Sequence, residues 1–359
     1  FQMTEFLNTE FKEFQQNFQQ FLNENINLPV SEMRAKSLDK GFYSISHQSF
    51  IHDGPATPLE MVIARESVAS LGILDHSNII GPDPGALINC SDEIKATYLD
   101  PMLKGEKKAS FAFTENDFQN PTTGELNDSS VIINGNKSYV SRAIESDFML
   151  VVLNFKPENS RFVAIVDSNS EGISFNKTFE SLDGSNHSEV TFENVKIPEM
   201  FLLKNVQAAT QNILQERLEM SAISVGLAIF TVNELSRKLL EIHRSGGSLS
   251  DREGIRLKYS DLRINTYAAR AMLYRTVALL EKSENAINEV SATKVFCTET
   301  AFNVVDSAIQ LTGGQSLIIG NNLEAIFRKT RSMKLAGGSN EILRLNISKG
   351  VFEFDSGIL

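Results

Sequence analysis

Apolar residues recur every three or four positions through the first hundred residues of the chain. The stretches FLNTEFKEFQQNFQQFLNEN, residues 6–25, and TPLEMVIARESVASLGIL, residues 57–74, follow this spacing most clearly. Such spacing gathers apolar side chains on one face of an α-helix. The pattern therefore predicts a helical domain over residues 1–108.

From residue 109 the spacing of apolar residues shortens to two. ASFAFTE (109–115), FMLVVLNF (148–155) and EVTFENVKI (189–197) are short runs typical of β-strands, separated by polar residues. The pair Asn134–Gly135 is typical of a two-residue hairpin turn. We predict a β domain of barrel or sandwich type over residues 109–203, with a hairpin at this pair.

Helical spacing returns after residue 203 and continues toward the end of the chain. Three long amphipathic stretches cover residues 206–243, 251–282 and 289–312, and the opening segment offers a fourth. Long helices joined by short polar loops favour an antiparallel four-helix bundle over residues 204–359. The predicted fold class is α+β, in the order helical domain, β domain, helical bundle.

Charge and cysteine usage narrow the possible functions. The net charge of −11 argues against a nucleic-acid-binding surface, and we interpret the basic segment Phe327–Lys334 as a solvated face. No apolar run approaches the ~18 residues of a membrane span, so we expect no membrane partner. Cys90 and Cys297 have no metal-ligand spacing, which favours a reducing, cytoplasmic setting.

Two smaller features complete the picture. His47 and His52 have no acidic partner in register, so we interpret them as structural residues and expect no metal site. Phe1 and Gln2, before Met3, resemble the remnant of a cleaved tag, and we leave them out of the fold prediction.

Five short motifs resemble signatures of one enzyme superfamily, in the same order along the chain. They are SFAFTEND (110–117), INGNKSYVS (133–141), VTFENVKIP (190–198), QLTGGQS (310–316) and LAGGSNEILR (335–344). Together with the α, β, α order they resemble the acyl-CoA dehydrogenase superfamily over nearly the whole chain. The resemblance implies a flavoprotein that binds FAD between its β domain and its helical bundle, as a homodimer or homotetramer.

The resemblance also implies the reaction and the partners. Members remove a proton from the α-carbon of an acyl thioester and a hydride from the β-carbon, then pass electrons to a carrier such as an electron-transfer flavoprotein. The cofactor supplies the hydride acceptor, so the protein must supply a base and a dry pocket. The expected substrate is an acyl-CoA or an acyl group on a carrier protein.

The usual catalytic base of the family is missing from its motif. Aligning LAGGSNE with the family's YEGTSE places Gly337 where many members have glutamate. Other members carry the base on a helix in a QERL-type segment, and Glu216 takes that position in LQERLEMSAIS, residues 214–224. We expect Ile213, Leu214, Leu218 and Ile223 to give it apolar surroundings, which would raise its pKa. Arg217 matches a recurrent arginine that would structure the pocket.

Other matched positions predict contacts with FAD. In the β domain these are Phe111, Phe113 and Thr114, with Tyr139 as the aromatic that covers the flavin and Ser141 as a hydrogen-bonding hydroxyl. In the bundle they are Gln310, Gly313 and Gly314, near a neighbouring subunit's FAD, and Ser339 and Glu341, near the dinucleotide. Gly337, Gly338 and a Ser339 or Asn340 cap also predict a turn that begins a helix.

Departures from the family pattern fall mainly on the substrate side. Arg244 is kept in HRSGGSLSDREGI, but the aromatic and glutamine of the family's FAD clamp are not recognisable. Asn120 replaces a serine of the pantetheine loop, and Ala336 replaces the tyrosine beside the usual base. These changes leave acyl-CoA and a carrier-bound acyl group, as in secondary metabolism, as open alternatives.

Two other functions remain open on the sequence alone. The altered substrate loop and the missing usual base would suit a flavin-dependent monooxygenase on the same scaffold. The changed FAD clamp would suit an interaction protein that no longer binds flavin. Hydroxylated product formed with reduced flavin and oxygen would identify the first, and purified protein that takes up no FAD the second.

Overall fold

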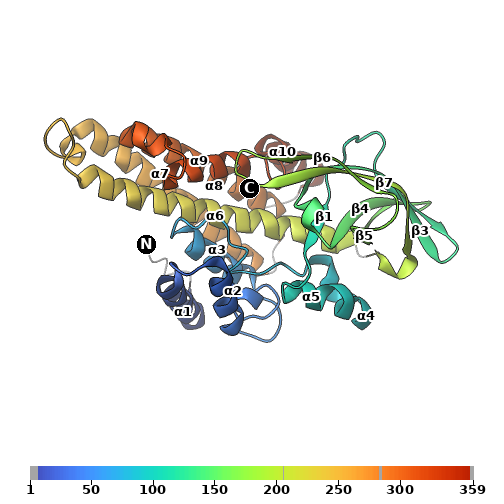
Figure 1. Cartoon of the computed structure of the whole chain (residues 1–359). Coiled ribbons are helices and arrows are strands. Elements are labelled where there is room, and N and C mark those ends of the chain that lie inside the picture. The colour runs from blue at the N-terminus through green and yellow to red at the C-terminus, as the bar shows by residue number, and fades with distance from the viewer. Residues whose placement is uncertain (1–6, 205, 283–284, 356–359) are drawn as a thin grey trace. The chain divides into compact units, whose positions relative to one another are not determined.

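The chain forms two compact units in a computed structural model (Figure 1). One unit contains the residues up to Gly81 together with those from Leu214 onward, and we call it the helical unit; the sheet unit is Pro82–Ile213. The structure describes residues 7–204, 206–282 and 285–355, without the side chains of 206–212. The tag prediction for Phe1 and Gln2 lies outside these residues.

The first helices of the chain belong to the helical unit. They are α1 (Thr9–Asn25), α2 (Val30–Asp39) and α3 (Pro58–Ala69). Thr57 and Glu60 form a capping box that begins α3, with Pro58 in its first turn. Phe14, Phe18 and Phe21 line one face of α1 at helical spacing and are buried, as the apolar pattern predicts.

The long C-terminal helices, with α6 from Leu214 onward, complete the same unit. They are α6 (Val206–Leu240), α7 (Glu253–Leu280), α8 (Ile287–Thr312), α9 (Asn322–Met333) and α10 (Asn340–Phe354). Helix α8 packs against α7, α9 and α10, whereas α1 packs against α3. Helices α9 and α10 thus pack on α8, which the sequence did not lead us to expect, while the opening segment packs on α3.

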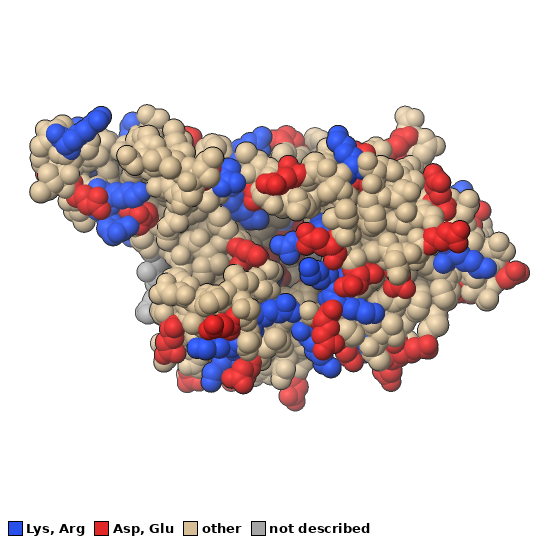
Figure 2. Space-filling model, in the orientation of Figure 1, with Lys and Arg blue, Asp and Glu red and all other residues tan. Residues whose placement is uncertain are grey.

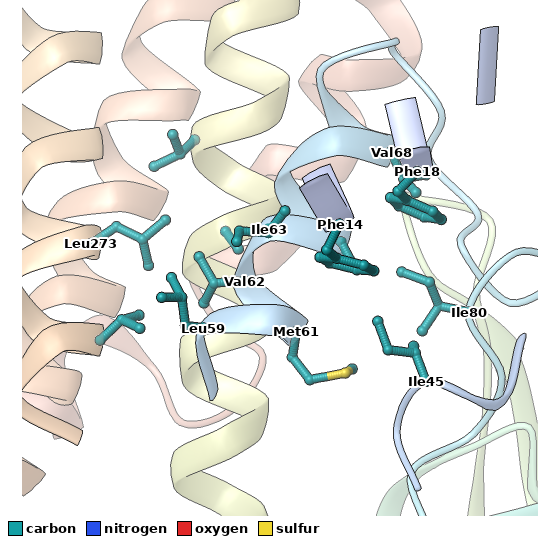
Figure 3. Packing of buried hydrophobic residues seen from close by; sticks show 14 of the residues in the cluster. Phe14, Phe18, Ile45, Leu59, Met61, Val62, Ile63, Val68, Ile80 and Leu273 are labelled. Atoms are coloured by element: carbon teal, nitrogen blue, oxygen red, sulfur yellow. The ribbon is translucent and has the colours of Figure 1, made fainter. Parts of the chain in front are cut away.

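One core joins the two ends of the chain. Side chains from α1 and α3, including Phe18 and Ile63, pack in one cluster with Leu218 of α6 and Leu273 of α7. Figure 3 shows Leu59, Val62 and Ile63 of α3 on the side that faces Leu273, with Phe14 and Phe18 across from them. Helix α3 is buried on nearly all sides, and its polar residues Glu60, Glu66 and Ser67 are buried together with its apolar ones.

Helix α6 contains a segment, Ile213–Leu240, that is long and apolar enough to cross a membrane by length and composition. Of its most apolar window, 72% is buried inside the protein, as in a core helix. Acidic and basic side chains are interspersed over the face that Figure 2 shows.

The sheet unit opens with short helices and continues as one mixed sheet. The helices α4 (Asp92–Ile94) and α5 (Asp100–Leu103) precede the strands. The strands are β1 (Ala109–Ala112), β2 (Thr123–Asn127), β3 (Ser130–Ser141), β4 (Phe148–Lys156), β5 (Ser160–Asp167), β6 (Ile173–Glu180), β7 (Asn186–Pro198) and β8 (Leu202–Leu203). Their order is β6-β7-β3-β2-β4-β5-β8, and β1 pairs in parallel with β4.

Both faces of the sheet are covered by apolar clusters, and strand β4 contributes side chains to each. Its alternate residues Met149, Val151 and Leu153 join the cluster on one face, while Phe148, Leu150 and Val152 join the cluster on the other. Because side chains of a strand alternate between faces, a strand that is covered on both sides is apolar throughout. The run FMLVVLNF reflects this double burial.

The predicted hairpin at Asn134–Gly135 is wrong. Both residues lie inside β3, where the pairing with β7 shifts register between Ile133 and Gly135. A Cβ at Gly135 would stand 2.5 Å from the Cα of Thr122. Glycine therefore permits a bulge and a close backbone approach here rather than a turn. The turn between β2 and β3 falls at Asp128, whose φ is 55°.

Candidate functional site

Glu216 of α6 lies beside the turn that contains Gly337. A Cβ built on Gly337 would stand 3.9 Å from Oε1 of Glu216 and 3.3 Å from Cε of Met220. Both residues belong to the helical unit, although they are more than a hundred positions apart. The Glu216 carboxylate therefore reaches the space beside the backbone where a side chain at position 337 would begin.

The surroundings of Glu216 are mixed rather than fully apolar. Leu218 is buried in the core and Ile223 packs against the bundle core, whereas Ile213 and Leu214 are only half-buried. The side chain of Glu216 is itself exposed. Burial of the carboxylate among protein atoms nevertheless raises its pKa, an effect that Arg217 opposes and Glu219 reinforces. The side chain of Glu216 thus reaches solvent, and the protein atoms around its carboxylate still raise its pKa.

Arg217 fastens the same turn to α6. Its Nε donates a hydrogen bond of 3.0 Å to the carbonyl oxygen of Gly337. Burial lowers the pKa of its guanidinium, and the Glu216 carboxylate raises it in part. The charge that was predicted to structure a pocket therefore holds the backbone of the glycine turn.

A second cation near the turn was not predicted. The side chain of Lys294, on α8, is fully buried, and its Nζ donates to the Asn340 Oδ1 at 2.9 Å and to the Gly338 carbonyl oxygen at 3.0 Å. Burial and the nearby Arg217 lower its pKa to about 8. The signal in the sequence was a lone lysine in the apolar run SATKVFC.

Glu219, the next glutamate on α6, forms an ion pair with Arg65. Glu219 Oε2 accepts a hydrogen bond of 2.7 Å from Nε of Arg65, on α3, and its Oε1 accepts one of 2.9 Å from Gln215. Both charged side chains of the ion pair are largely buried. This pair distinguishes Glu219 from Glu216, one turn away on the same helix.

The glycine turn begins α10 as the sequence predicts. Ser339 is the N-cap, and its hydroxyl accepts from the backbone N–H of Ile342 at 3.3 Å. Gly337 and Gly338 have φ values of 64° and 94°, a region that favours glycine. Glu341 lies in the first turn and is exposed, and Ala336 is exposed before the glycines.

In the sheet unit, the predicted flavin contacts gather where β1 and β3 run side by side. The Thr114 carbonyl oxygen accepts from the Ser138 N–H at 3.0 Å, and the Ser110 hydroxyl donates to the Ser141 carbonyl oxygen at 2.9 Å. Phe111 and Phe113 stack with ring centroids 5.9 Å apart. These bonds bring the ends of both strands together.

Tyr139 is the most unusual of these residues. Its φ is 55°, its side chain is 65% exposed, and its ring meets Phe179 edge-on at 5.7 Å. Large exposed aromatics in left-handed backbone conformations are rare and often mark functional sites. Thr114 and Ser141 are also exposed, so an aromatic face and two hydroxyls are accessible on this part of the unit.

The loop that contains Asn120 is fixed at its base. Glu115 accepts from the hydroxyl of Thr122 at 2.8 Å and pairs with the buried ammonium of Lys137, which also donates to the Phe113 carbonyl oxygen at 3.1 Å. Asn120 itself donates to Asp117 within the exposed loop.

The remaining predicted contacts lie at the surface of the helical unit. Arg244 is exposed in the connection between α6 and α7. Gln310, Gly313 and Gly314 are exposed at the end of α8, and a Cβ on either glycine would meet no atom within 4 Å. Among the residues that the structure describes, no group of three or more His, Cys, Asp or Glu side chains could hold a metal ion.

Comparison with known proteins gives matches over most of the chain. Residues 206–352 match the family model for the acyl-CoA dehydrogenase C-terminal domain. The chain is 26% identical to a 3-(aryl)acrylate reductase of Clostridium sporogenes, covering 83% of this chain and 82% of the relative. It is 24% identical to the caffeyl-CoA reductase-Etf complex subunit CarC of Acetobacterium woodii, covering 88% and 89%.

Solved structures agree over nearly the full length. The fold matches a probable acyl-CoA dehydrogenase from Mycobacterium abscessus with a TM-score of 0.85 and 19% identity, over 96% of this chain and all of that one. It also matches the FAD complex of PigA, with a TM-score of 0.81 and 17% identity, over 96% and 98%. The C-terminal part of the chain is thus similar to the acyl-CoA dehydrogenase C-terminal domain, and its fold is that of acyl-CoA dehydrogenases over nearly the full length.

Proposed function

We propose that the protein is an FAD-dependent oxidoreductase acting on the CH–CH bond of an acyl thioester, with Glu216 as the base that takes the α-proton. The observation that carries the proposal is the 3.9 Å between Glu216 Oε1 and the Cβ position of residue 337. A carboxylate on α6 thus lies next to the backbone position that carries the base in many members. The fold and the relatives support the flavoprotein class.

The reaction moves one proton and one hydride. The α-carbon loses its proton to the Glu216 carboxylate, the β-carbon loses a hydride, and a carbon–carbon double bond forms. FAD, when bound, supplies the hydride acceptor. The raised pKa of Glu216 makes it a stronger base toward a carbon acid, provided that the pH is high enough to ionise it. The first relatives include reductases, and by microscopic reversibility the same groups would serve the reverse direction.

The accessible groups of the sheet unit fit a flat, polar ring system. Tyr139 offers an exposed aromatic face, and Thr114 and Ser141 offer hydroxyls beside it. Phe111 and Phe113 add apolar surface. In the helical unit, Gln310, Gly313 and Gly314 leave open backbone at the end of α8, where close approach by a ligand is sterically free. Arg244, Ser339 and Glu341 belong to the proposal as contacts that only the resemblance supports.

The acyl thioester of the substrate could be carried by CoA or by a carrier protein. The loop with Asn120 is exposed and differs from the family pattern, and Phe118 within it is 83% exposed. An exposed aromatic near the substrate loop would suit contact with a carrier protein, whereas a free CoA would need the phosphate and pantetheine contacts of other members. Bleaching of the flavin by matched acyl-CoA and acyl-carrier thioesters distinguishes the two.

The proposal includes partners and a setting. One relative is a subunit of a complex with an Etf, which supports an electron-transfer flavoprotein as the electron partner. Leu257, Ile264 and Tyr267 are exposed along α7, and this apolar stripe supports a homodimer or homotetramer. Cys90 and Cys297 are free thiols, which supports the cytoplasm.

The test is the rate of flavin reduction in single-turnover experiments with Glu216→Gln. Loss of a general base should lower that rate by roughly 10²- to 10⁴-fold, while FAD content and substrate affinity change little. Glu234→Gln is the matched control, because Glu234 lies on the same helix but pairs with Arg237. Reduction by Glu216→Gln at the rate of the control would refute the assignment of the base.

A further inference from the structure

Lys294 makes a set of contacts that all converge on one turn. Its buried ammonium reaches the Gly338 carbonyl oxygen at 3.0 Å, the Asn340 Oδ1 at 2.9 Å and, at a longer 3.5 Å, the carbonyl oxygen of Lys334. Lys334 is the C-cap of α9, and Asn340 is the first residue of α10. One ammonium of α8 therefore ties the end of one helix to the start of the next.

Burial of a lysine ammonium lowers the stability of the fold unless each of its N–H donors has an acceptor. An ammonium has three N–H donors and no acceptor, and burying it without partners is strongly unfavourable. Here three oxygens face the three donors. Asn340 is held in turn, because its Nδ2 donates to the hydroxyl of Thr298 on α8 at 3.1 Å. The geometry is that of a specific anchor rather than of a lysine stem buried by chance.

The turn that Lys294 holds is the one beside Glu216. Two consecutive carbonyl groups are each bound by a cation from a different helix: Gly337 by Arg217 of α6, and Gly338 by Lys294 of α8. Two adjacent glycines have the greatest conformational freedom of any residue pair, so their geometry depends on such external bonds. Without Lys294, the Gly338 carbonyl oxygen would lose its bond to α8, while Gly337 would keep its bond to Arg217 and Asn340 its bond to Thr298.

We propose that Lys294 is a positioning residue, which fixes the Gly337–Gly338 turn against α6 and thereby sets where Glu216 meets the substrate. The inference rests on the proposed function for its effect on the reaction. The hydrogen bonds by which Lys294 holds the turn do not depend on that function.

Charged groups around Lys294 give the anchor a pH dependence. Arg217 of α6 lowers the pKa of Lys294, while Glu216 of α6, Glu299 of α8 and Glu341 of α10 raise it. Burial is the largest effect, and the resulting pKa is about 8. The charged form therefore prevails below pH 8. As pH rises through this value the lysine loses one donor and its charge, so its hydrogen bonds to the turn weaken on the alkaline side, although release of a buried charge favours the folded protein as a whole.

The experiment compares three variants as FAD-loaded, full-length protein. Lys294→Met removes the ammonium, and Lys294→Arg keeps a charge that does not titrate in this range. Thr293→Val is the matched control, because Thr293 is the preceding residue of α8, is equally buried and bonds only to Thr276 among the contacts described. Two readouts are taken: amide hydrogen exchange over residues 334–341, and single-turnover flavin reduction from pH 6 to 10.

We expect Lys294→Met to speed exchange over residues 334–341 and to lower the reduction rate by ten- to a hundredfold, with substrate affinity changed less. Thr293→Val should do neither. Lys294→Arg should regain part of the rate and should lack the alkaline fall of the unmodified protein. If Lys294→Met does not fold, the pH profile of Lys294→Arg decides: an alkaline fall identical to that of the unmodified protein overturns the proposal.

The two proposals fail separately. Unchanged exchange over residues 334–341 in folded Lys294→Met overturns the anchor, whatever the reduction rate. Faster exchange with an unchanged rate overturns the positioning role. A Glu216→Gln variant that reduces flavin normally overturns the choice of base, and the exchange data still test the hold of Lys294 on the turn.

Discussion

Two glutamates of the helical unit, Glu66 on α3 and Glu216 on α6, are placed in opposite ways. The carboxylate of Glu66 is buried and accepts from Arg270 at 2.6, 3.0 and 3.1 Å, with the Tyr274 hydroxyl at 3.4 Å. Glu216 is exposed, and its cationic neighbours Arg217 and Lys294 donate to backbone oxygens of the glycine turn. The bonds of Glu66 hold it within the fold, whereas the two cations near Glu216 bind the glycine turn, which leaves its carboxylate available for the proposed role as a base.

The largest effect is expected when the cation that binds Glu66 is removed. Arg270→Met should leave a buried carboxylate without its cation and should lower the free energy of unfolding by about 3–5 kcal/mol. Chemical denaturation measures this loss. Flavin reduction per folded molecule should stay near normal.

The double variant Glu66→Gln, Arg270→Met serves as the control for that prediction. It removes both charges, so it should be more stable than Arg270→Met alone. A single variant as stable as the unmodified protein would mean that the pair contributes little to the fold.

Glu216 should behave in the reverse manner. Its pKa is raised in the folded protein, so the ionised form opposes folding, and the unmodified protein should lose stability as pH rises through that pKa. Glu216→Gln, which does not titrate, should avoid this loss and be more stable at neutral pH by at most about 1 kcal/mol, because solvent screening reduces the effect. Thermal unfolding at several pH values measures the difference. A stability loss in Glu216→Gln would instead indicate a structural carboxylate.

A comparably small effect is expected at the turn itself. Gly337→Ala places a Cβ at a φ of 64°, which should cost about 1 kcal/mol, and close to Cε of Met220 at 3.3 Å. We expect a modest drop in melting temperature and a severalfold slower flavin reduction. Gly254→Ala, where a Cβ meets no neighbour, should change neither. Equal effects of the two variants would show that the turn is not specially constrained.

Periodicity predicted the fold classes well because burial follows it closely. Strand β1 begins at Ala109, where the apolar spacing changes, and α6, α7 and α8 match the three long amphipathic stretches. The hairpin prediction at Asn134–Gly135 was wrong because a glycine allows a bulge as well as a turn. The close approach of Thr122, which requires glycine at this bulge, cannot be seen in the local sequence. Pairing across a long sequence separation is invisible in a local pattern.

The site was predictable only in part. Glu216 was proposed from a resemblance and from the glycine at position 337, since a glutamate among Gln215, Arg217 and Glu219 otherwise resembles an exposed helix face. Lys294 was missed because local sequence does not reveal which backbone oxygens a lysine will meet. Its three acceptors come from residues 40 or more positions further along the chain.

The helical unit is built from two segments that are synthesised at different times, because the sheet unit lies between them in the chain. Helices α1 and α3 leave the ribosome long before α6, α7 and Cys297 of α8, with which they share a core. Residues 82–213 form the first compact unit that is complete in one continuous stretch. Nascent chains should therefore hold folded strands while α1 still exposes its phenylalanine-rich face and α3 its apolar residues, an interval in which chaperone binding would protect them.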